Sequence, residues 1–199
     1  FLDKDDFVDA LVPLCLAGEQ VTSERFRRNM EEAVIAPAGL LFVDVDGVLT
    51  NGDILLMKDD FVRILNSRDG YAIQYAVKQG YRILIITGGT SELVAERLLG
   101  LGIEEVRLKS YNKLAVYNDL KEKYGFSDEE VLYMGDDIPD YQVLKQVGVS
   151  TCPQDAAVEI KAITDYQSPF NGGRHCVRDV IEQTLRVQKK WFNENAFEW

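Results

Sequence analysis

A short apolar run that ends in two carboxylates constrains the fold of this chain more than any other stretch. Leu-Leu-Phe-Val begins at Leu40, and Asp44-Val-Asp46-Gly follows it directly. The length and apolar character of the run indicate a buried parallel strand, and such strands lead into functional loops at their carboxyl ends. If the extended geometry persists, Asp44 and Asp46 leave the strand on the same side. Two like charges buried together require a cation, and carboxylate oxygens favour a hard one such as Mg²⁺.

Taken alone, an Asp-x-Asp pair favours a plainer interpretation, in which two solvated aspartates follow a strand. Three further segments change that balance. Thr87 and Gly88 follow one apolar run. Asp136 and Asp137 follow another, and Lys113 begins a helical pattern. In an open α/β sheet the ends of such strands converge on one crevice where ligands bind. The crevice would hold carboxylates, a hydroxyl and an ammonium group, which is the set needed for phosphoryl transfer through an aspartyl-phosphate.

The four segments, present in this order, resemble the four motifs of the haloacid dehalogenase superfamily of phosphatases. The resemblance implies that Asp44 attacks phosphorus as the nucleophile. Asp46 would protonate the leaving alkoxide and then remove a proton from the water that hydrolyses the intermediate. Asp44, Asp136 and the backbone carbonyl of Asp46 would bind Mg²⁺, which neutralises developing charge.

The other motif residues would hold the phosphoryl group and balance its charge. By the same resemblance, Thr87 and the Gly88 amide bind the phosphoryl oxygens, and Lys113 offsets the charge between nucleophile and phosphate. Asp137 and Asp140 would support the metal site or orient Lys113. Each residue also has a plainer interpretation: a strand-end threonine, a surface lysine, or a solvated acidic helix start that the macrodipole favours. Their joint presence in this order favours an enzyme.

Strands alternate with helices along the rest of the chain, which predicts an α/β fold with a Rossmann-like, doubly wound parallel sheet. Asp69 and Ser91 are the predicted N-caps of two helices, and Ser127-x-x-Glu130 is a predicted capping box. The predicted strands after the first span residues 81–87, 104–108, 131–134 and 149–152, and the predicted helices span residues 69–78, 91–101, 113–124, 138–147, 156–162 and 176–190.

The gaps between the motifs leave no room for a cap domain. Between Asp46 and Thr87 there is space for a β-hairpin, one helix and one strand, and between Lys113 and Asp136 for a helix and a strand. A site without a cap is open, so either its substrate is bulky or a neighbouring subunit covers it. The hairpin, residues 53–65, is apolar on both faces and marginal alone. We expect it to form a flap that pairs with a hairpin of another subunit, with packing on its own domain as the alternative.

Both gaps match a subfamily, the 3-deoxy-D-manno-octulosonate 8-phosphate phosphatases, which residues 40–188 resemble. The segments that carry the resemblance are residues 44–52, 68–70, 86–88, 135–137 and 172–178. It implies a capless, Mg²⁺-dependent homotetramer that hydrolyses a phosphorylated eight-carbon sugar acid in lipopolysaccharide biosynthesis. Arg68 would contact the carboxylate or the phosphate of the substrate, and Arg174 and the C-terminal tail would close over a site. For Arg68, an ordinary surface arginine is an equally good interpretation.

Three positions depart from the pattern of that subfamily. Gly89 stands where the family usually has Arg, so one expected cation near the phosphate is missing. Asn112 replaces a common Asp before the motif lysine. His175 and Cys176 replace Gly-Ala, and this local change favours packing rather than catalysis as the role of His175. These departures leave the phosphatase chemistry intact and leave the exact substrate open.

Two other functions compete with the eight-carbon substrate. One is hydrolysis of a nine-carbon nonulosonate 9-phosphate, against which the Arg68-Asp69-Gly70 segment tilts the comparison. The other is a non-catalytic assembly domain, which the retained motif carboxylates and Lys113 disfavour. A phosphomutase is disfavoured because mutases normally need a cap to retain the intermediate.

Length, charge and cysteines bound the remaining possibilities. The 199 residues favour one phosphatase domain over residues 39–190, with a helical N-terminal extension over 1–38 and a tail over 191–199. The net charge of −11 should repel nucleic acid and anionic membranes. Three cysteines without metal-type spacing indicate reduced thiols in the cytoplasm: Cys15, Cys152 and Cys176. No apolar run is long enough to span a bilayer, and no signal peptide is visible.

Overall fold

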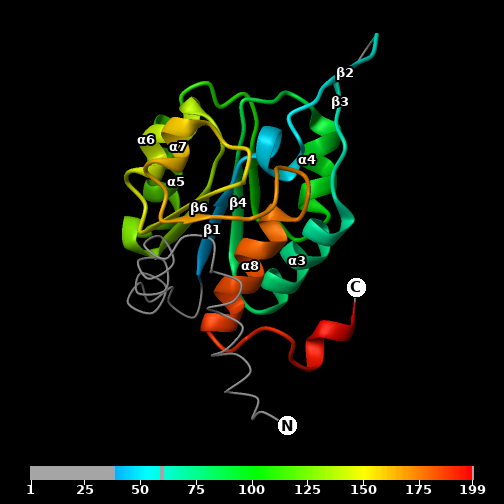
Figure 1. The fold of residues 1–199 in the computed structure, drawn as a ribbon, viewed down its shortest axis with the longest axis vertical. Coiled ribbons are helices and arrows are strands. Elements are labelled where there is room, and N and C mark those ends of the chain that lie inside the picture. Colours follow the sequence, from blue (N-terminus) through cyan, green and yellow to red (C-terminus); the bar gives the residue numbers. More distant parts are fainter. Residues whose placement is uncertain (1–38, 59–60, 199) are drawn as a thin grey trace.

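The computed structural model describes residues 39–58 and 61–198 (Figure 1). The helices expected over residues 1–38, and Cys15 with them, lie outside the described residues. Within the described ranges, six strands form one parallel sheet in the order β5-β4-β1-β6-β7-β8, which confirms the predicted α/β class. The strands are β1 (Leu40–Val43), β4 (Arg82–Ile86), β5 (Glu105–Arg107), β6 (Val131–Met134), β7 (Val149–Cys152) and β8 (Tyr166–Gln167).

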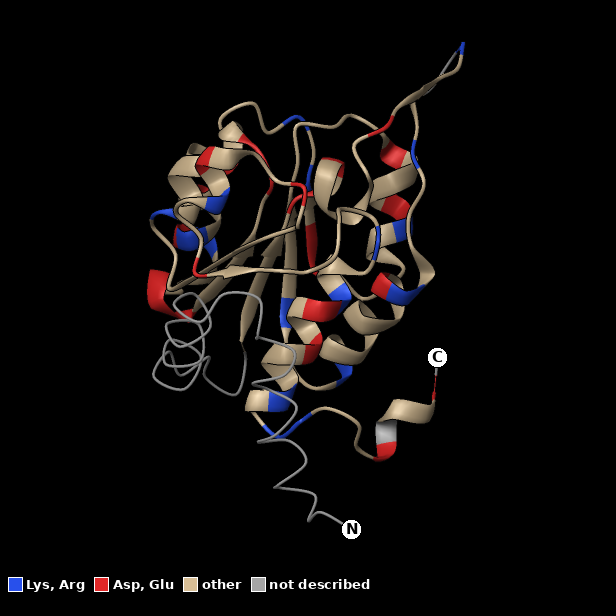
Figure 2. Ribbon diagram, in the orientation of Figure 1, with Lys and Arg blue, Asp and Glu red and all other residues tan. Residues whose placement is uncertain are grey.

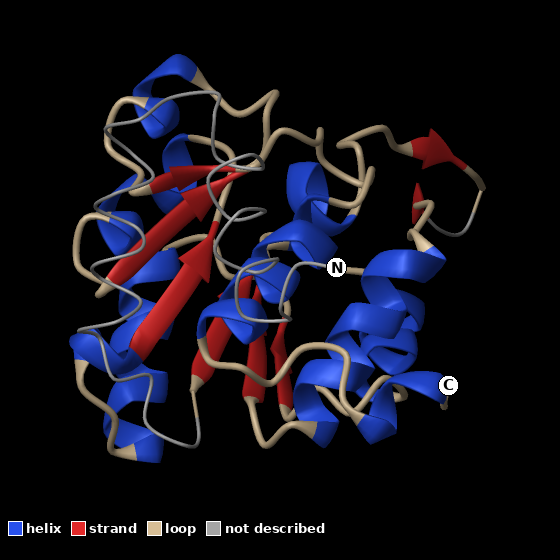
Figure 3. Ribbon diagram, turned by 60° about the horizontal axis from the view of Figure 1, so that its bottom comes forward, coloured by secondary structure: helices blue, strands red, loops and turns tan. Residues whose placement is uncertain are grey.

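β1 is apolar along its whole length because both faces of the sheet are covered. Leu41 and Val43 belong to one hydrophobic cluster, and Leu40 and Phe42 belong to the other. The first cluster lies under α3, α4 and α8, and the second under α5, α6 and α7 (Figures 1 and 3). The helices are α3 (Ser67–Lys78), α4 (Glu92–Leu99), α5 (Lys113–Tyr124), α6 (Tyr141–Leu144), α7 (Val158–Lys161) and α8 (Cys176–Val187), and the shorter turns are η1 (Val45–Leu49), η2 (Asp128–Glu130), η3 (Ile138–Asp140) and η4 (Glu194–Phe197). A central parallel strand buried on both faces needs no alternation of polar and apolar residues.

The predicted start of one helix is wrong, and that of a second is right in position but lacks the expected capping bond. α3 begins before Asp69, because Asn66 is its N-cap and the Asn66 side chain accepts a hydrogen bond from the Arg68 amide at 2.9 Å. Ser91 occupies the N-cap position of α4, but its side chain makes no capping hydrogen bond. The helix predicted over 138–147 is divided between η3 and α6.

Two smaller features behave differently from each other. The predicted capping box is confirmed, since the Ser127 amide donates to the Glu130 carboxylate at 2.7 Å and begins the turn η2 that leads into β6. The sequence pattern does not predict β8. That strand is two residues long, and Tyr166-Gln167 is not an apolar run, so no periodicity marks it.

The hairpin projects from the body of the fold (Figure 1). Its strands, β2 (Leu55–Leu56) and β3 (Phe61–Val62), pair in antiparallel register. Leu55 is 62% exposed, Leu56 73% and Met57 57%. The alternative in which these side chains pack on their own domain is therefore wrong, and the projecting flap is confirmed.

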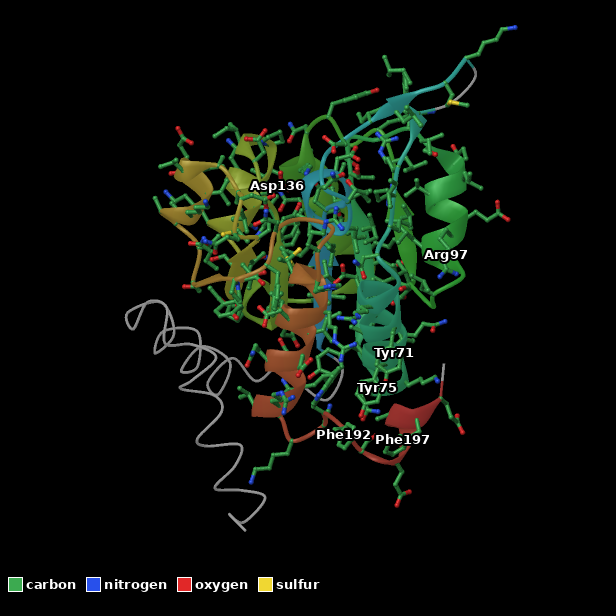
Figure 4. All side chains as sticks on the ribbon, turned by 45° about the vertical axis from the view of Figure 1, so that its right-hand side comes forward. Tyr71, Tyr75, Arg97, Asp136, Phe192 and Phe197 are labelled. Atoms are coloured by element: carbon green, nitrogen blue, oxygen red, sulfur yellow. The ribbon has the colours of Figure 1, made fainter. Side chains whose placement is uncertain are left out.

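The last described residues pack against α3. The hydroxyl groups of Tyr75 and Tyr71 donate to carbonyl oxygens of this segment, at Lys190 and Ala196 respectively. Figure 4 shows both tyrosines beside the C-terminal segment and away from Asp136. Within one chain, the tail therefore lies apart from the strand ends that carry the motif residues.

The two described cysteines, Cys152 and Cys176, are buried free thiols. Burial raises the pKa of the Cys152 thiol to about 11 and raises that of Cys176 further, so both are held in the unreactive protonated form. Among the residues that the structure describes, no helix is long and apolar enough to cross a membrane.

Candidate active site

The motif residues meet at one edge of the sheet because their strands are neighbours. Asp44 follows β1, Thr87 follows β4 and Asp136 follows β6, and β1 pairs in parallel with both of the other strands. Figure 2 shows acidic segments gathered at this edge, above the central strands. Asp44 is 5% exposed and Thr87 2%, so these two side chains are withdrawn from bulk water. The convergence that the sequence predicts is confirmed.

Lys113, the first residue of α5, lies between two carboxylates. Its Nζ contacts Asp44 Oδ2 at 2.9 Å and donates to Asp140 Oδ1 at 2.7 Å. Asp140 is fully buried and also accepts a hydrogen bond from the Tyr133 hydroxyl at 2.6 Å. Burial opposes the charge on Lys113, but the two carboxylates outweigh it, so the pKa of the ammonium group is raised and it stays charged. Asp140 thus orients Lys113 toward Asp44.

The carboxylate cluster fits a divalent cation. Oxygens of Asp44, Asp136 and Asp140 lie within 4.8 Å of one another. Within the described part of the chain, Asp44 Oδ1 and Asp136 Oδ1 are buried without any hydrogen-bond partner. Burial of carboxylate oxygens without a partner is costly. Such oxygens are suitable ligands for a hard cation such as Mg²⁺.

The raised pKa values of Asp44 and Asp136 also indicate a site that needs a cation. Desolvation by burial, followed by repulsion from Asp140, raises the pKa of Asp44 to about 7 against the opposing pull of Lys113. Desolvation and the charges of Asp44 and Asp140 raise the pKa of Asp136 to about 8. Without a cation, the site therefore disfavours the ionised form of both groups.

Glycines allow the loop after β1 to touch Asp136 and the segment before α8. Gly47 has φ +89°, and a Cβ atom there would stand 2.0 Å from Asp136 Oδ2. A Cβ atom at Gly172 would stand 1.9 Å from the Gly47 carbonyl oxygen, and one at Gly173 would stand 2.7 Å from the Asn51 nitrogen. The Gly-Gly segment therefore supports the loop after β1 by close backbone contact.

Asp46 has a partner that sequence reasoning misses. Arg63, which follows β3 directly, makes a bidentate ion pair with the Asp46 carboxylate. The one signal for it in the sequence is a charged residue inside an otherwise apolar segment. Near this pair, Thr87 Oγ1 accepts a hydrogen bond from the Gly89 amide at 3.1 Å, and Gly88 is exposed.

Arg68 and Arg174, the two arginines expected at the substrate, are both exposed. Neither side chain makes a hydrogen bond or ion pair with the residues that the structure describes. Asp137, at the N-cap position of η3, is exposed and its side chain makes no capping bond. The structure therefore brings Asp44, Asp136 and Lys113 together. It leaves the side chains of Arg68, Arg174 and Asp137 at the surface.

Asp69, the predicted N-cap of α3, instead caps the start of α8. Its buried carboxylate accepts hydrogen bonds from the backbone amides of Arg178 at 2.8 Å and His175 at 3.3 Å, at the start of α8. His175 has φ +81°, and its ring contacts Phe170 edge to face at 6.0 Å between centroids. These contacts agree with the expected packing role of His175.

Comparison with known proteins gives one family. Residues 100–181 match the sequence profile of the haloacid dehalogenase-like hydrolases. The 3-deoxy-D-manno-octulosonate 8-phosphate phosphatase of Escherichia coli K12 is 38% identical over 152 residues, which cover 76% of this chain and 81% of that enzyme.

Solved structures of such phosphatases have the same fold. The enzyme from Yersinia pestis superposes with a TM-score of 0.76 at 32% identity, covering 81% of this chain and 88% of that one. The enzyme from Moraxella catarrhalis, solved with a magnesium ion, a phosphate ion and the sugar acid KDO, superposes with a TM-score of 0.77 at 27% identity. That match covers 82% of this chain and 94% of the other.

Proposed function

This chain belongs to the 3-deoxy-D-manno-octulosonate 8-phosphate phosphatases among the haloacid dehalogenase-like hydrolases, and on that premise we propose that it hydrolyses this phosphorylated eight-carbon sugar acid. The products are the free sugar acid and phosphate. One observation carries the proposal: Asp44 and Asp136 present buried, unpartnered carboxylate oxygens beside a charged lysine at the end of the central strand.

Asp44 is the proposed nucleophile. Its side chain is nearly inaccessible to bulk water, and Lys113 contacts one of its oxygens at 2.9 Å. The lysine lowers the repulsion between an attacking carboxylate and a phosphate dianion. Asp140 accepts hydrogen bonds from both Lys113 and the Tyr133 hydroxyl. Because these contacts hold the lysine in position, its positive charge lies beside Asp44 before the substrate binds.

Mg²⁺ is the proposed cofactor, held by the carboxylates of Asp44 and Asp136 and by the backbone carbonyl of Asp46. Bound there, it would neutralise charge on the transferring phosphoryl group. Gly47 is needed for this arrangement because any larger residue would meet the Asp136 carboxylate.

Asp46 is the proposed acid and base. It protonates the leaving sugar alkoxide as the aspartyl-phosphate forms on Asp44, and it then takes a proton from the water that releases phosphate. Thr87 and the Gly88 amide hold the phosphoryl oxygens. Burial of Thr87 and exposure of Gly88 place this segment between the sheet edge and solvent, where a phosphate can enter.

Arg68 and Arg174 remain proposed substrate contacts. Both are exposed and neither is paired with a described residue, so each guanidinium is available to the carboxylate or phosphate of a sugar acid. Their neighbours Asp69 and Gly173 fix the backbone on either side, through the start of α8 and the loop after β1.

Assembly and location follow from other surfaces. We propose a homotetramer in which the exposed apolar hairpin is covered by hairpins of other subunits, since a patch of this kind is unusual on a monomer. We also propose that residues 39–190 form the phosphatase domain, with 1–38 and 191–199 as appended segments. The free thiols of Cys152 and Cys176 support a cytoplasmic location. Light scattering at several concentrations tests the subunit number, and a dilution-stable monomer would contradict it.

Phosphate release from a panel of sugar phosphates tests the function. The panel includes the eight-carbon and nine-carbon keto-acid phosphates, each with and without Mg²⁺. We expect Mg²⁺-dependent release with a strong preference for the eight-carbon compound. Preference for the nine-carbon compound would keep the mechanism and change the substrate. No release by folded, metal-loaded protein would refute the phosphatase and favour a non-catalytic assembly domain.

A further inference from the structure

Arg63 lies between β3 and α3, and no sequence motif singles it out. Its guanidinium donates two hydrogen bonds to the Asp46 carboxylate, from Nε to Oδ1 at 2.6 Å and from a terminal nitrogen to Oδ2 at 2.9 Å. The other terminal nitrogen donates to the Phe61 carbonyl oxygen at 3.0 Å. This fork fixes the plane of the carboxylate as well as its position.

The burial of Arg63 sets it apart from its neighbours on the hairpin. The side chain of Arg63 is only 5% exposed, although the residue as a whole is half-buried, whereas the residues Val62 and Ile64 are exposed. A segment that exposes its apolar residues and buries its arginine reverses the usual preference of these residue types. Removal of a guanidinium from water is costly unless it gains a paired anion, and the fork to Asp46 supplies one.

Gly89 leaves open the space beside this guanidinium. A Cβ atom at residue 89 would stand 3.6 Å from a terminal nitrogen of Arg63, 3.4 Å from Asp46 Oδ2 and 3.3 Å from Thr87 Oγ1. A side chain here would therefore begin between the phosphate-binding threonine and Asp46, against Arg63. The cation that is missing at residue 89 is matched by a cation that reaches the same place from residue 63.

We propose that Arg63 is a positioning residue for Asp46 and takes the place of the side-chain cation missing at Gly89. This inference rests on the proposed phosphatase function. Proton transfer to the leaving oxygen requires the Asp46 carboxyl group, protonated for this step, to be held in line, and a misplacement of about 1 Å costs about 100-fold in rate. Because the arginine comes from the hairpin segment, the flap contributes to the active site of its own chain.

A purely structural role for Arg63 makes different predictions. If the ion pair only anchors the hairpin, its loss lowers stability and affects binding and turnover together. If it positions Asp46, its loss lowers kcat more than it raises KM, and a guanidinium supplied from residue 89 restores part of kcat. Residue 89 is on the loop after β4, so that second guanidinium would not anchor the hairpin backbone.

The experiment compares steady-state kinetics of five proteins at saturating Mg²⁺: the unchanged chain, Arg63→Met, Arg63→Lys, the double variant Arg63→Met/Gly89→Arg and a control. Lys58→Met is the matched control, because Lys58 is an exposed cation of the same hairpin. Each protein is assayed with the eight-carbon sugar-acid phosphate and with p-nitrophenyl phosphate, so that a wrong choice of sugar does not obscure the comparison. Thermal melting with and without Mg²⁺ reports folding and metal binding.

We expect Arg63→Met to lower kcat by about 100-fold, the contribution of a positioned acid–base group, with a smaller change in KM and a preserved Mg²⁺-induced rise in Tm. Arg63→Lys keeps the positive charge but cannot make the two parallel hydrogen bonds, so its kcat should lie between those of Arg63→Met and the unchanged chain. The double variant should recover at least about tenfold in kcat over Arg63→Met.

Three results would overturn the proposal. The first is a kcat for both Arg63 variants equal to that of Lys58→Met. The second is a double variant no better than Arg63→Met, which would assign the contact to anchoring alone. The third is an unchanged chain that hydrolyses neither substrate, which refutes the proposed function first and this inference with it. If Arg63→Met does not fold, the comparison of Arg63→Lys with Gly89→Arg/Arg63→Lys decides by the same criterion.

Discussion

Gly47→Ala tests the close contact between the loop after β1 and Asp136. The added Cβ atom would stand 2.0 Å from Asp136 Oδ2, a separation below the 3.0 Å that real Cβ atoms keep. The Asp136 carboxylate must therefore withdraw by about 1 Å, and a misplacement of that size costs about 100-fold in rate. The φ of +89° adds about 1–2 kcal/mol of backbone strain to the variant.

A matched control separates the two effects. Gly125, the C-cap of α5, also has a positive φ, at +67°, and a Cβ atom there would meet nothing within 4 Å. Gly125→Ala should therefore lose about 1–2 kcal/mol of stability through strain alone and keep full turnover. Gly47→Ala should lose similar stability and, in addition, about 100-fold in kcat/KM and at least about tenfold in Mg²⁺ affinity.

The assay pairs thermal melting with Mg²⁺ titration of phosphate release. A Gly47→Ala variant with the turnover and Mg²⁺ requirement of Gly125→Ala would refute the reasoning. It would mean that the Asp136 carboxylate does not need its observed position.

Three further predictions concern the same carboxylates and the cap of α8. Asp44→Asn should abolish turnover. At about pH 8 the metal-free variant should melt at a higher temperature than the unchanged chain, because the substitution removes a buried carboxyl whose pKa is raised to about 7. A lower Tm for the variant would contradict this. The folded-state pKa values of Asp44 and Asp136 lie above the ordinary value of 3.8, so the metal-free fold should lose stability as pH rises from about 4 to about 8. The Mg²⁺-induced rise in Tm should grow over the same pH window. A rise in Tm that is independent of pH would argue against metal binding by these two groups. Asp69→Ala should lower stability by about 1–3 kcal/mol, since two backbone amides at the start of α8 lose their acceptor, whereas Asp69→Asn should lose less; equal melting of the two variants would exclude the capping role.

The fold is predictable from the sequence where burial is complete. β1 and β6 are apolar runs because helices cover both faces of the sheet and every residue of the two strands is buried. β8 escapes prediction because it is two residues long and depends on its neighbour β7 for its geometry. Helix starts are less predictable, since Asn66 and Asp69 are both good caps and only the tertiary contact of Asp69 with α8 decides between them.

The site is predictable where strand ends bring motif residues together. Asp44, Thr87 and Asp136 needed only the strand order to meet. Arg63 could not be predicted, because its contact with Asp46 depends on how the hairpin returns to the body of the fold and not on any local pattern. The same limit applies to Arg68 and Arg174, whose exposed side chains are assigned to the substrate by resemblance and not by a contact within the chain.

Detection of a phosphoryl group on Asp44 is the most direct test of this account. The purified chain is mixed with radiolabelled eight-carbon sugar-acid phosphate and Mg²⁺, quenched in acid during the first turnover, and digested for peptide mapping. The account predicts label on the peptide that contains Asp44, released at alkaline pH as an acyl phosphate is, and no label in Asp44→Asn. Phosphate release during the first turnover with no labelled protein, or label on another residue, would contradict it.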